Sequence, residues 1–165
     1  FMDNESLKRE VVALLRRNAR MSDQEIADRL GSTAGTIAGL IQELERDGVL
    51  MGYKAIVNDQ SDNGEVRAII EVEVRPERDT GFDIVAERLA KFPEVQSVYL
   101  VSGRYDLRLE VAGHSLQEIA SFVSGQLAPQ DGVKSTATYF LLKQYKEAGV
   151  QFSKDEKHER LKIVP

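Results

Sequence analysis

The sequence predicts an α+β protein of two modules, an all-helical one at the N-terminus and a mixed one after it. Apolar residues recur at helical spacing as far as Asp47, and from Val66 onward alternating strand patterns are interleaved with two helical ones. The 165 residues are enough for two small domains, each with its own core. The expected boundaries are a first domain at 1–57, a linker at 58–65, a second domain at 66–145 and a C-terminal extension at 146–165.

The first helix is predicted from apolar residues that fall on one helical face. Its start is Asp3 or Asn4, and the apolar positions are Leu7, Val11, Leu14 and Leu15. The second helix begins with a capping box, in which Ser22 accepts from the backbone of Glu25 while the Glu25 carboxylate reaches back.

A tight corner and a third helix follow. Gly31 ends the second helix because it tolerates a left-handed backbone, and Ser32 or Thr33 caps the next one. A small β-wing is expected at Gly48–Tyr53. Three short helices with a glycine corner and a wing are typical of a winged helix-turn-helix, which presents its third helix to the DNA major groove.

The second module alternates between the two periodicities. A period-two strand at 66–74 is followed by a helical pattern at 82–92, strands at 95–102 and 106–111, a helical pattern at 116–127 and a strand at 133–143. The order β-α-β-β-α-β is that of the ferredoxin-like fold. Both helices then cover one face of an antiparallel sheet, and we expect a second subunit to cover the other face.

Composition narrows the possible functions. The chain is 42% hydrophobic and 30% charged and carries no cysteine, which excludes disulfides and thiolate metal sites. No apolar run is long enough to span a membrane, so we expect no membrane partner, and the absence of cysteine makes the cytoplasm the expected location. The net charge is −5, and residues 1–57 hold 8 Lys/Arg against 9 Asp/Glu. Attraction to phosphates must therefore come from local clusters of basic residues.

Three separate motifs resemble one known family. They are Leu44-Glu45-Arg46-Asp47-Gly48-Val49-Leu50-Met51-Gly52-Tyr53, then Val101-Ser102-Gly103-Arg104-Tyr105-Asp106-Leu107, then Asp131-Gly132-Val133-Lys134-Ser135-Thr136-Ala137-Thr138. In this order and on this fold, they resemble the Lrp/AsnC family of bacterial and archaeal transcription regulators over residues 3–145. The resemblance implies an N-terminal DNA-binding domain and a C-terminal domain that senses an amino acid or related metabolite. It also implies homodimers formed through the open sheet faces, which commonly assemble into octamers.

The expected DNA contacts lie at the start of the third helix and on nearby basic residues. Hydroxyls and one amide can reach bases or phosphates, and arginine or lysine can reach the backbone; the candidates are Ser22, Ser32, Thr33, Thr36, Gln42, Arg16, Arg17 and Lys54. The family often carries two arginines later in this helix, and this chain has Leu40 and Glu43 there. That departure weakens the expected phosphate clamp. A helix-turn-helix kept for packing or protein contact is the alternative.

The expected effector site is the turn between two strands together with part of the last strand. Glycine and aspartate are ordinary turn residues, so the sequence alone favours simple hairpin chemistry there. The resemblance instead implies a cleft lined by Ser102, Gly103, Arg104, Tyr105, Asp106, Thr136 and Thr138. Asp106 is able to accept from a ligand ammonium, and the threonine hydroxyls are able to bind a carboxylate.

Two further functions remain open at this point. One is an architectural DNA-binding protein without an effector, and the other is an enzyme like the sirohaem decarboxylases, which share the two-module organisation. The sequence offers few acid–base groups for such chemistry, so we expect no enzyme and no cofactor. His114 and His158 are isolated from each other and predict no metal site.

Overall fold

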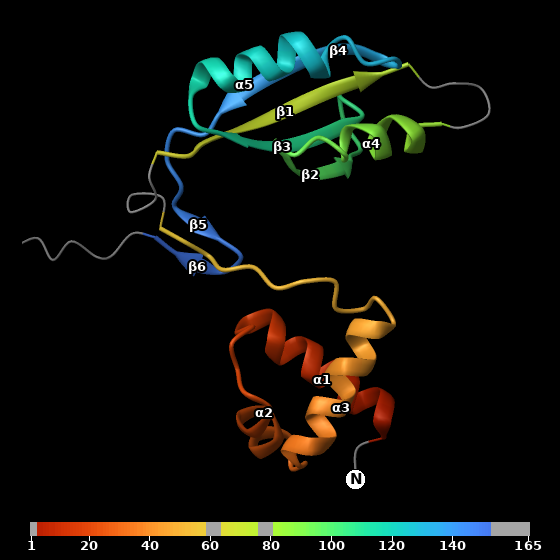
Figure 1. The fold of residues 1–165 in the computed structure, drawn as a ribbon, viewed down its shortest axis with the longest axis vertical. Coiled ribbons are helices and arrows are strands. Elements are labelled where there is room, and N and C mark those ends of the chain that lie inside the picture. The colour runs from red at the N-terminus through yellow and green to blue at the C-terminus, as the bar shows by residue number, and fades with distance from the viewer. Residues whose placement is uncertain (1–2, 59–63, 76–80, 153–165) are drawn as a thin grey trace, which may run out of the picture. The chain divides into compact units, whose positions relative to one another are not determined.

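The computed structural model describes residues 3–58, 64–75 and 81–152. The chain divides into two compact units, Phe1–Ala55 and Ile56–Pro165, which are described separately (Figure 1). No helix within the described ranges is both long and apolar enough to cross a membrane.

The first unit contains the three predicted helices, α1 (Asn4–Arg17), α2 (Asp23–Leu30) and α3 (Ala34–Arg46). Their inward faces form one apolar cluster whose buried members are Val11, Leu15, Ile26, Ala27, Ile37 and Leu44. Each helix contributes two of these six residues, so no helix can hold its place without the other two. This mutual burial fixes the orientation of α3 on the unit.

The helix ends follow the predicted caps. Asp3 caps α1 by accepting from the Ser6 N–H at 2.7 Å, and the capping box of Ser22 and Glu25 is complete. Thr33 caps α3, which resolves the choice between Ser32 and Thr33. These side chains accept hydrogen bonds from N–H groups that have no partner within their own helix.

The prediction of β-strands at Gly48–Tyr53 is wrong. No strand is assigned between Arg46 and Val66 in the described part of the chain. The N–H groups of Val49 and Leu50 both bond to the Leu44 carbonyl, which closes the end of α3. Residues 51–58 then continue as an exposed, extended segment. A wing needs two paired strands, and none is assigned among the described residues that follow α3 before β1.

The second unit has the predicted ferredoxin-like order. Its elements are β1 (Val66–Val74), α4 (Asp83–Leu89), β2 (Val95–Leu100), β3 (Leu107–Gly113), α5 (Leu116–Phe122), η1 (Val123–Leu127), β4 (Val133–Phe140), β5 (Lys146–Glu147) and β6 (Val150–Gln151). The four long strands form an antiparallel sheet in the order β2-β3-β1-β4 (Figure 1). The predicted α+β class is therefore confirmed.

Both helices pack on the same face of this sheet. The buried residues of β1 are Ala68, Ile70, Val72 and Val74, which alternate along the strand and so point to one side. They join Val85 and Leu89 of α4 and Ile119 and Phe122 of α5 in a single core. The opposite face carries the intervening residues of each strand.

Two local features of this unit differ from the prediction. The helix predicted at 116–127 changes to a π-helical turn, η1, after Phe122. Across this wider turn the buried residues Phe122 and Leu127 lie five positions apart, which is the spacing that a π-helical turn brings to one side. The last strand ends at Phe140 instead of Lys143, and a short hairpin, β5–β6, extends the unit beyond residue 145.

Candidate DNA interface and effector site

A sharp turn after α2 sets the start of α3. The backbone of Gly31 is left-handed with φ +65°, and Ser32 donates its N–H to the Ala27 carbonyl at 3.0 Å before Thr33 begins the cap. This makes α2 and α3 a helix-turn-helix pair, in which the N-terminal turns of the second helix meet the base edges. The predicted contacts Ser32, Thr33, Thr36 and Gln42 all lie on this corner or on α3.

Several of the predicted hydroxyl contacts already bond within the unit. The Ser22 Oγ accepts from the Glu25 N–H at 3.2 Å and donates to Glu25 Oε2 at 2.9 Å. The Thr33 Oγ1 accepts from the Thr36 N–H at 3.2 Å and lies 2.9 Å from the Thr36 Oγ1. All three side chains and Gln42 are exposed. Ser22 donates its proton to Glu25 and keeps one lone pair that can accept from a base, whereas one of the Thr33 and Thr36 hydroxyls keeps a proton that can donate to a phosphate or base.

The predicted basic contacts are exposed and lie on other elements. Arg16 and Arg17 form the last turn of α1, and Lys54 lies on the extended segment after α3. Of the 13 residues of α3, only Arg46 is positively charged. The recognition helix therefore contributes little charge of its own towards phosphate binding.

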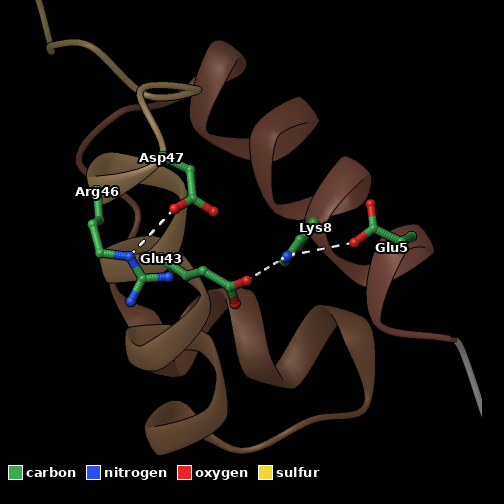
Figure 2. A network of polar contacts seen from close by, with 5 residues as sticks. All are labelled: Glu5, Lys8, Glu43, Arg46 and Asp47. Atoms are coloured by element: carbon green, nitrogen blue, oxygen red, sulfur yellow. Dashed lines mark hydrogen bonds and ion pairs between the residues drawn. The ribbon is translucent and has the colours of Figure 1, made fainter.

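The two α3 positions where the family often has arginine face the rest of the unit. Leu40 is only 6% exposed. Glu43 accepts from the Nζ of Lys8 on α1 at 2.7 Å, and this pair is partly buried (Figure 2). Packing and ion pairing occupy both positions here. The phosphate clamp expected of the family is thus missing from this helix.

The turn at 102–106 is anchored to the end of β1 through Asp106. Its Oδ2 accepts from the Val74 N–H at 2.8 Å, and its own N–H donates to the Val72 carbonyl at 3.1 Å. Asp106 therefore has a structural role that the sequence did not predict. One carboxylate oxygen is used there, which leaves Oδ1 as the atom that would meet a ligand ammonium.

The exposed part of this turn reaches a polar cluster on the open sheet face. The Arg104 guanidinium carbon lies 5.8 Å from the centre of the Tyr105 ring. Hydrogen bonds from Lys134 at 2.6 Å and from Ser135 at 2.9 Å lower the pKa of Glu73, and the nearby Arg104 charge lowers it further. The charge of Arg104 therefore acts on Glu73, although 31 positions separate the two residues in the sequence.

Sheet register places Thr136 and Thr138 on the other face. Thr136 lies opposite Val72 and Thr138 opposite Ile70, and both β1 residues are buried beneath the helices. Val72 also lies opposite Leu107, so Thr136 and the end of the turn are two strand spacings, about 10 Å, apart. The predicted effector residues are therefore not brought together within this unit, because the threonines lie on the helix-covered face and Arg104 lies near the open-face cluster.

The sequence analysis missed the polar cluster that this turn approaches. It consists of Glu71, Glu73, Lys134, Ser135 and Tyr139. The charge of Glu71 raises the pKa of Tyr139, whose hydroxyl lies 3.4 Å from that carboxylate. The alternation along β1 could have placed Glu71 and Glu73 on the open face from the sequence alone. The β4 members of the cluster, Lys134, Ser135 and Tyr139, become visible only from the strand register. Among the described residues, no group of three or more histidine or acidic side chains is placed to hold a metal ion.

Family models match both units. A winged helix-turn-helix DNA-binding model matches residues 5–51, and an Lrp/AsnC ligand binding domain model matches residues 67–151. The chain belongs to the Lrp/AsnC family. It is a DNA-binding transcriptional regulator and not an enzyme, so the sirohaem-decarboxylase alternative is excluded.

Similar proteins match over nearly the whole chain. The uncharacterized HTH-type transcriptional regulator YugG of Bacillus subtilis is 39% identical over 94% of this chain and 95% of its own length. The leucine-responsive regulatory protein of Rhizobium meliloti is 26% identical over 87% of this chain and 92% of its own. Among solved structures, the regulator NMB0573 of Neisseria meningitidis, in complex with L-Met, matches with a TM-score of 0.66. That match has 24% identity and covers 89% of this chain and 94% of the other.

Proposed function

We propose that this regulator reads double-stranded DNA with α3 and that its C-terminal domain senses an amino acid or a related small metabolite. The observation that carries the effector half is the match of the ligand binding domain model to the whole sheet unit. The name of the Rhizobium relative refers to leucine, which supports an amino acid as the ligand class. We place the action of this regulator in the cytoplasm. Its proposed partner is chromosomal DNA, and in bacteria, the source of the relative YugG, that DNA lies in the cytoplasm.

On the DNA side, we assign base contacts to the exposed start and middle of α3. Gln42 is the residue best suited to recognise a base, since its amide can pair bidentately with adenine. Ser22, Ser32, Thr33 and Thr36 would contact phosphates or base edges through hydroxyls. Arg16, Arg17 and Lys54 would contact the DNA backbone.

On the effector side, we assign the ligand to the end of the sheet where the 102–106 turn meets β4. Asp106 Oδ1 would accept from the ligand ammonium, and Thr136 and Thr138 of another subunit in the assembly would donate to its carboxylate, because within one subunit they lie on the opposite face of the sheet from Arg104. Ser102, Gly103, Arg104 and Tyr105 would form one wall of the site. Binding there would change how the DNA-binding units of one assembly meet the operator, and by linkage DNA would change ligand affinity by the same factor.

Assembly follows from the sheet face that the helices leave uncovered. We propose a homodimer formed through this face and further assembly to an octamer. Two tyrosines on it are about half exposed, Tyr99 at 49% and Tyr139 at 52%. Between them run Arg108 and Glu71, which lie directly opposite each other on β3 and β1. Aromatic side chains among paired charges suit a polar but tightly packed interface.

A ligand panel tests the effector half. The melting temperature of the full chain is measured with each amino acid at millimolar concentration, and any ligand that raises it is tested in a DNA mobility shift. A true effector raises the melting temperature by mass action and changes the shift. Thr138→Val should abolish the response while keeping the fold, and Ser124→Ala, an exposed hydroxyl on η1, is the matched control.

The second candidate is an architectural DNA-binding protein without an effector. The observation in its favour is the low charge of α3, because weak single contacts suit binding through many sites at once. No melting-temperature change across the panel, together with unchanged DNA binding, would favour this candidate. That result would not affect the assignment of DNA binding to α3.

A further inference from the structure

The second half of α3 carries an arrangement of charge that opposes DNA binding. Three of its last four residues are charged, Glu43, Glu45 and Arg46, so the helix end has an excess of one negative charge. A carboxylate facing a phosphate backbone is repelled at short range. A recognition helix with this sequence needs some means of keeping its carboxylates away from the DNA.

The structure shows that both carboxylates are bonded to other parts of the unit. Glu43 Oε1 lies 2.7 Å from the Lys8 Nζ, and the Lys8 side chain is only 16% exposed (Figure 2). Lys8 is also within 3.4 Å of Glu5, one turn earlier on α1. Glu45 Oε1 accepts from the Tyr53 hydroxyl at 2.9 Å.

Arg46 is placed differently. Its side chain is 73% exposed, and its ion pair with the adjacent Asp47 is 3.3 Å long and open to solvent (Figure 2). Exposed pairs of this kind contribute little, so the guanidinium can exchange Asp47 for a phosphate at small cost. Arg46 shares a helical stripe with Gln42, Gly39 and Gly35, all exposed and spaced by three or four residues.

We propose that Lys8 of α1 is a positioning residue for DNA binding: it holds the Glu43 carboxylate against α1, so that the exposed stripe of α3 meets DNA through Gln42 and Arg46. This inference rests on the proposed DNA binding by α3. The hydrogen bond from Lys8 to Glu43 raises the Lys8 pKa, so Lys8 stays charged throughout the neutral range. The pair replaces one of the arginines often found in the family and neutralises the carboxylate at that position.

Fluorescence anisotropy with full-length variants tests the proposal, on a promoter fragment from upstream of the protein's own gene and on a scrambled fragment. At about 50 mM salt, Lys8→Met should weaken binding to both fragments about three- to tenfold and lower the salt slope, because the released Glu43 carboxylate repels the DNA phosphates. Lys8→Arg should retain affinity. Lys91→Gln, which removes an exposed charge in the other unit, should change affinity less than about twofold.

The double variant Lys8→Met/Glu43→Gln decides the mechanism. If Lys8 acts through Glu43, removal of both charges restores the affinity and salt slope of the wild type. If Lys8 contacts phosphate itself, the double variant binds as weakly as Lys8→Met, and the proposal is overturned. Equal binding by Lys8→Met and wild type would overturn it as well.

A second variant covers the case in which Lys8→Met fails to fold. Glu43→Gln alone removes the carboxylate that Lys8 holds, so this variant should bind both fragments at least as tightly as the wild type, whereas weaker binding contradicts the proposal. The proposed function has a separate criterion, which is tighter binding to the promoter than to the scrambled fragment. If the wild type binds both fragments equally, sequence-specific binding is refuted. The role of Lys8 is still tested in that case, because the variants can be compared with the wild type on either fragment.

Discussion

Gly132→Ala should destabilise the sheet unit more than any other glycine-to-alanine change in its described part. Gly132 precedes β4 with φ +85°, and its carbonyl accepts from the Arg75 N–H at 2.8 Å. A left-handed conformation costs a residue with a Cβ about 1–2 kcal/mol. A Cβ added there would also lie 2.7 Å from Cγ2 of the buried Val85. Relieving such a clash in a packed core costs about 1–3 kcal/mol.

The expected total loss is therefore about 2–5 kcal/mol, a large part of a domain's stability. Urea unfolding followed by circular dichroism, at one fixed protein concentration, measures it. Gly149→Ala is the matched control, because φ is +87° there and nothing lies within 4 Å of the added Cβ. Val85→Ala should relieve part of the Gly132→Ala loss in a double-mutant cycle. Equal losses at the two glycines, with no coupling to Val85, would refute the steric reasoning.

Three further predictions concern the caps, pH and the turn. Ser22→Ala should cost the helical unit about 1 kcal/mol, seen as a lower melting temperature; no change would mean that the capping box is not formed in solution. Hydrogen bonds from the Ser22 backbone and hydroxyl lower the Glu25 pKa below 4.5, so its stabilisation should be present near pH 6 and lost as the pH falls below 4.5. The melting-temperature difference between wild type and Glu25→Gln should shrink over that range, and a constant difference would contradict this. Asp106→Ala should cost about 1–3 kcal/mol without any ligand, because the Val74 N–H loses its acceptor; a loss of ligand response alone would rule out the structural role.

Local sequence signals predicted the helix caps and the first strand of the sheet. Ser22, Glu25 and Gly31 act within a few residues of each other, so their chemistry is visible in the sequence itself. Strand β1 matched its predicted bounds, because period-two alternation is unambiguous over nine residues. The overall β-α-β-β-α-β order followed from such signals.

Features that depend on distant partners were not visible in the sequence. Lys8 and Glu43 are 35 residues apart, and Asp106 anchors Val74 across 32 residues. The wing was predicted at Gly48–Tyr53, and whether a strand forms there depends on a pairing partner that a local pattern does not show. The π-helical turn at η1 puts Leu127 on the same buried side as Phe122, five positions earlier, a spacing that a regular helical pattern does not give. The arrangement of the expected effector residues could not be predicted for the same reason. Only the strand register shows which face of the sheet Thr136 occupies.

The measurement that tests the account most directly is an anisotropy titration of the wild-type chain against its own promoter fragment and a scrambled fragment. It is done at about 50 mM and about 200 mM salt, because phosphate contacts weaken with salt while base contacts persist. Our account predicts tighter binding to the promoter, with the preference retained at the higher salt. Equal, weak and steeply salt-dependent binding to both fragments would contradict it, because α3 would then sense only the backbone charge of DNA.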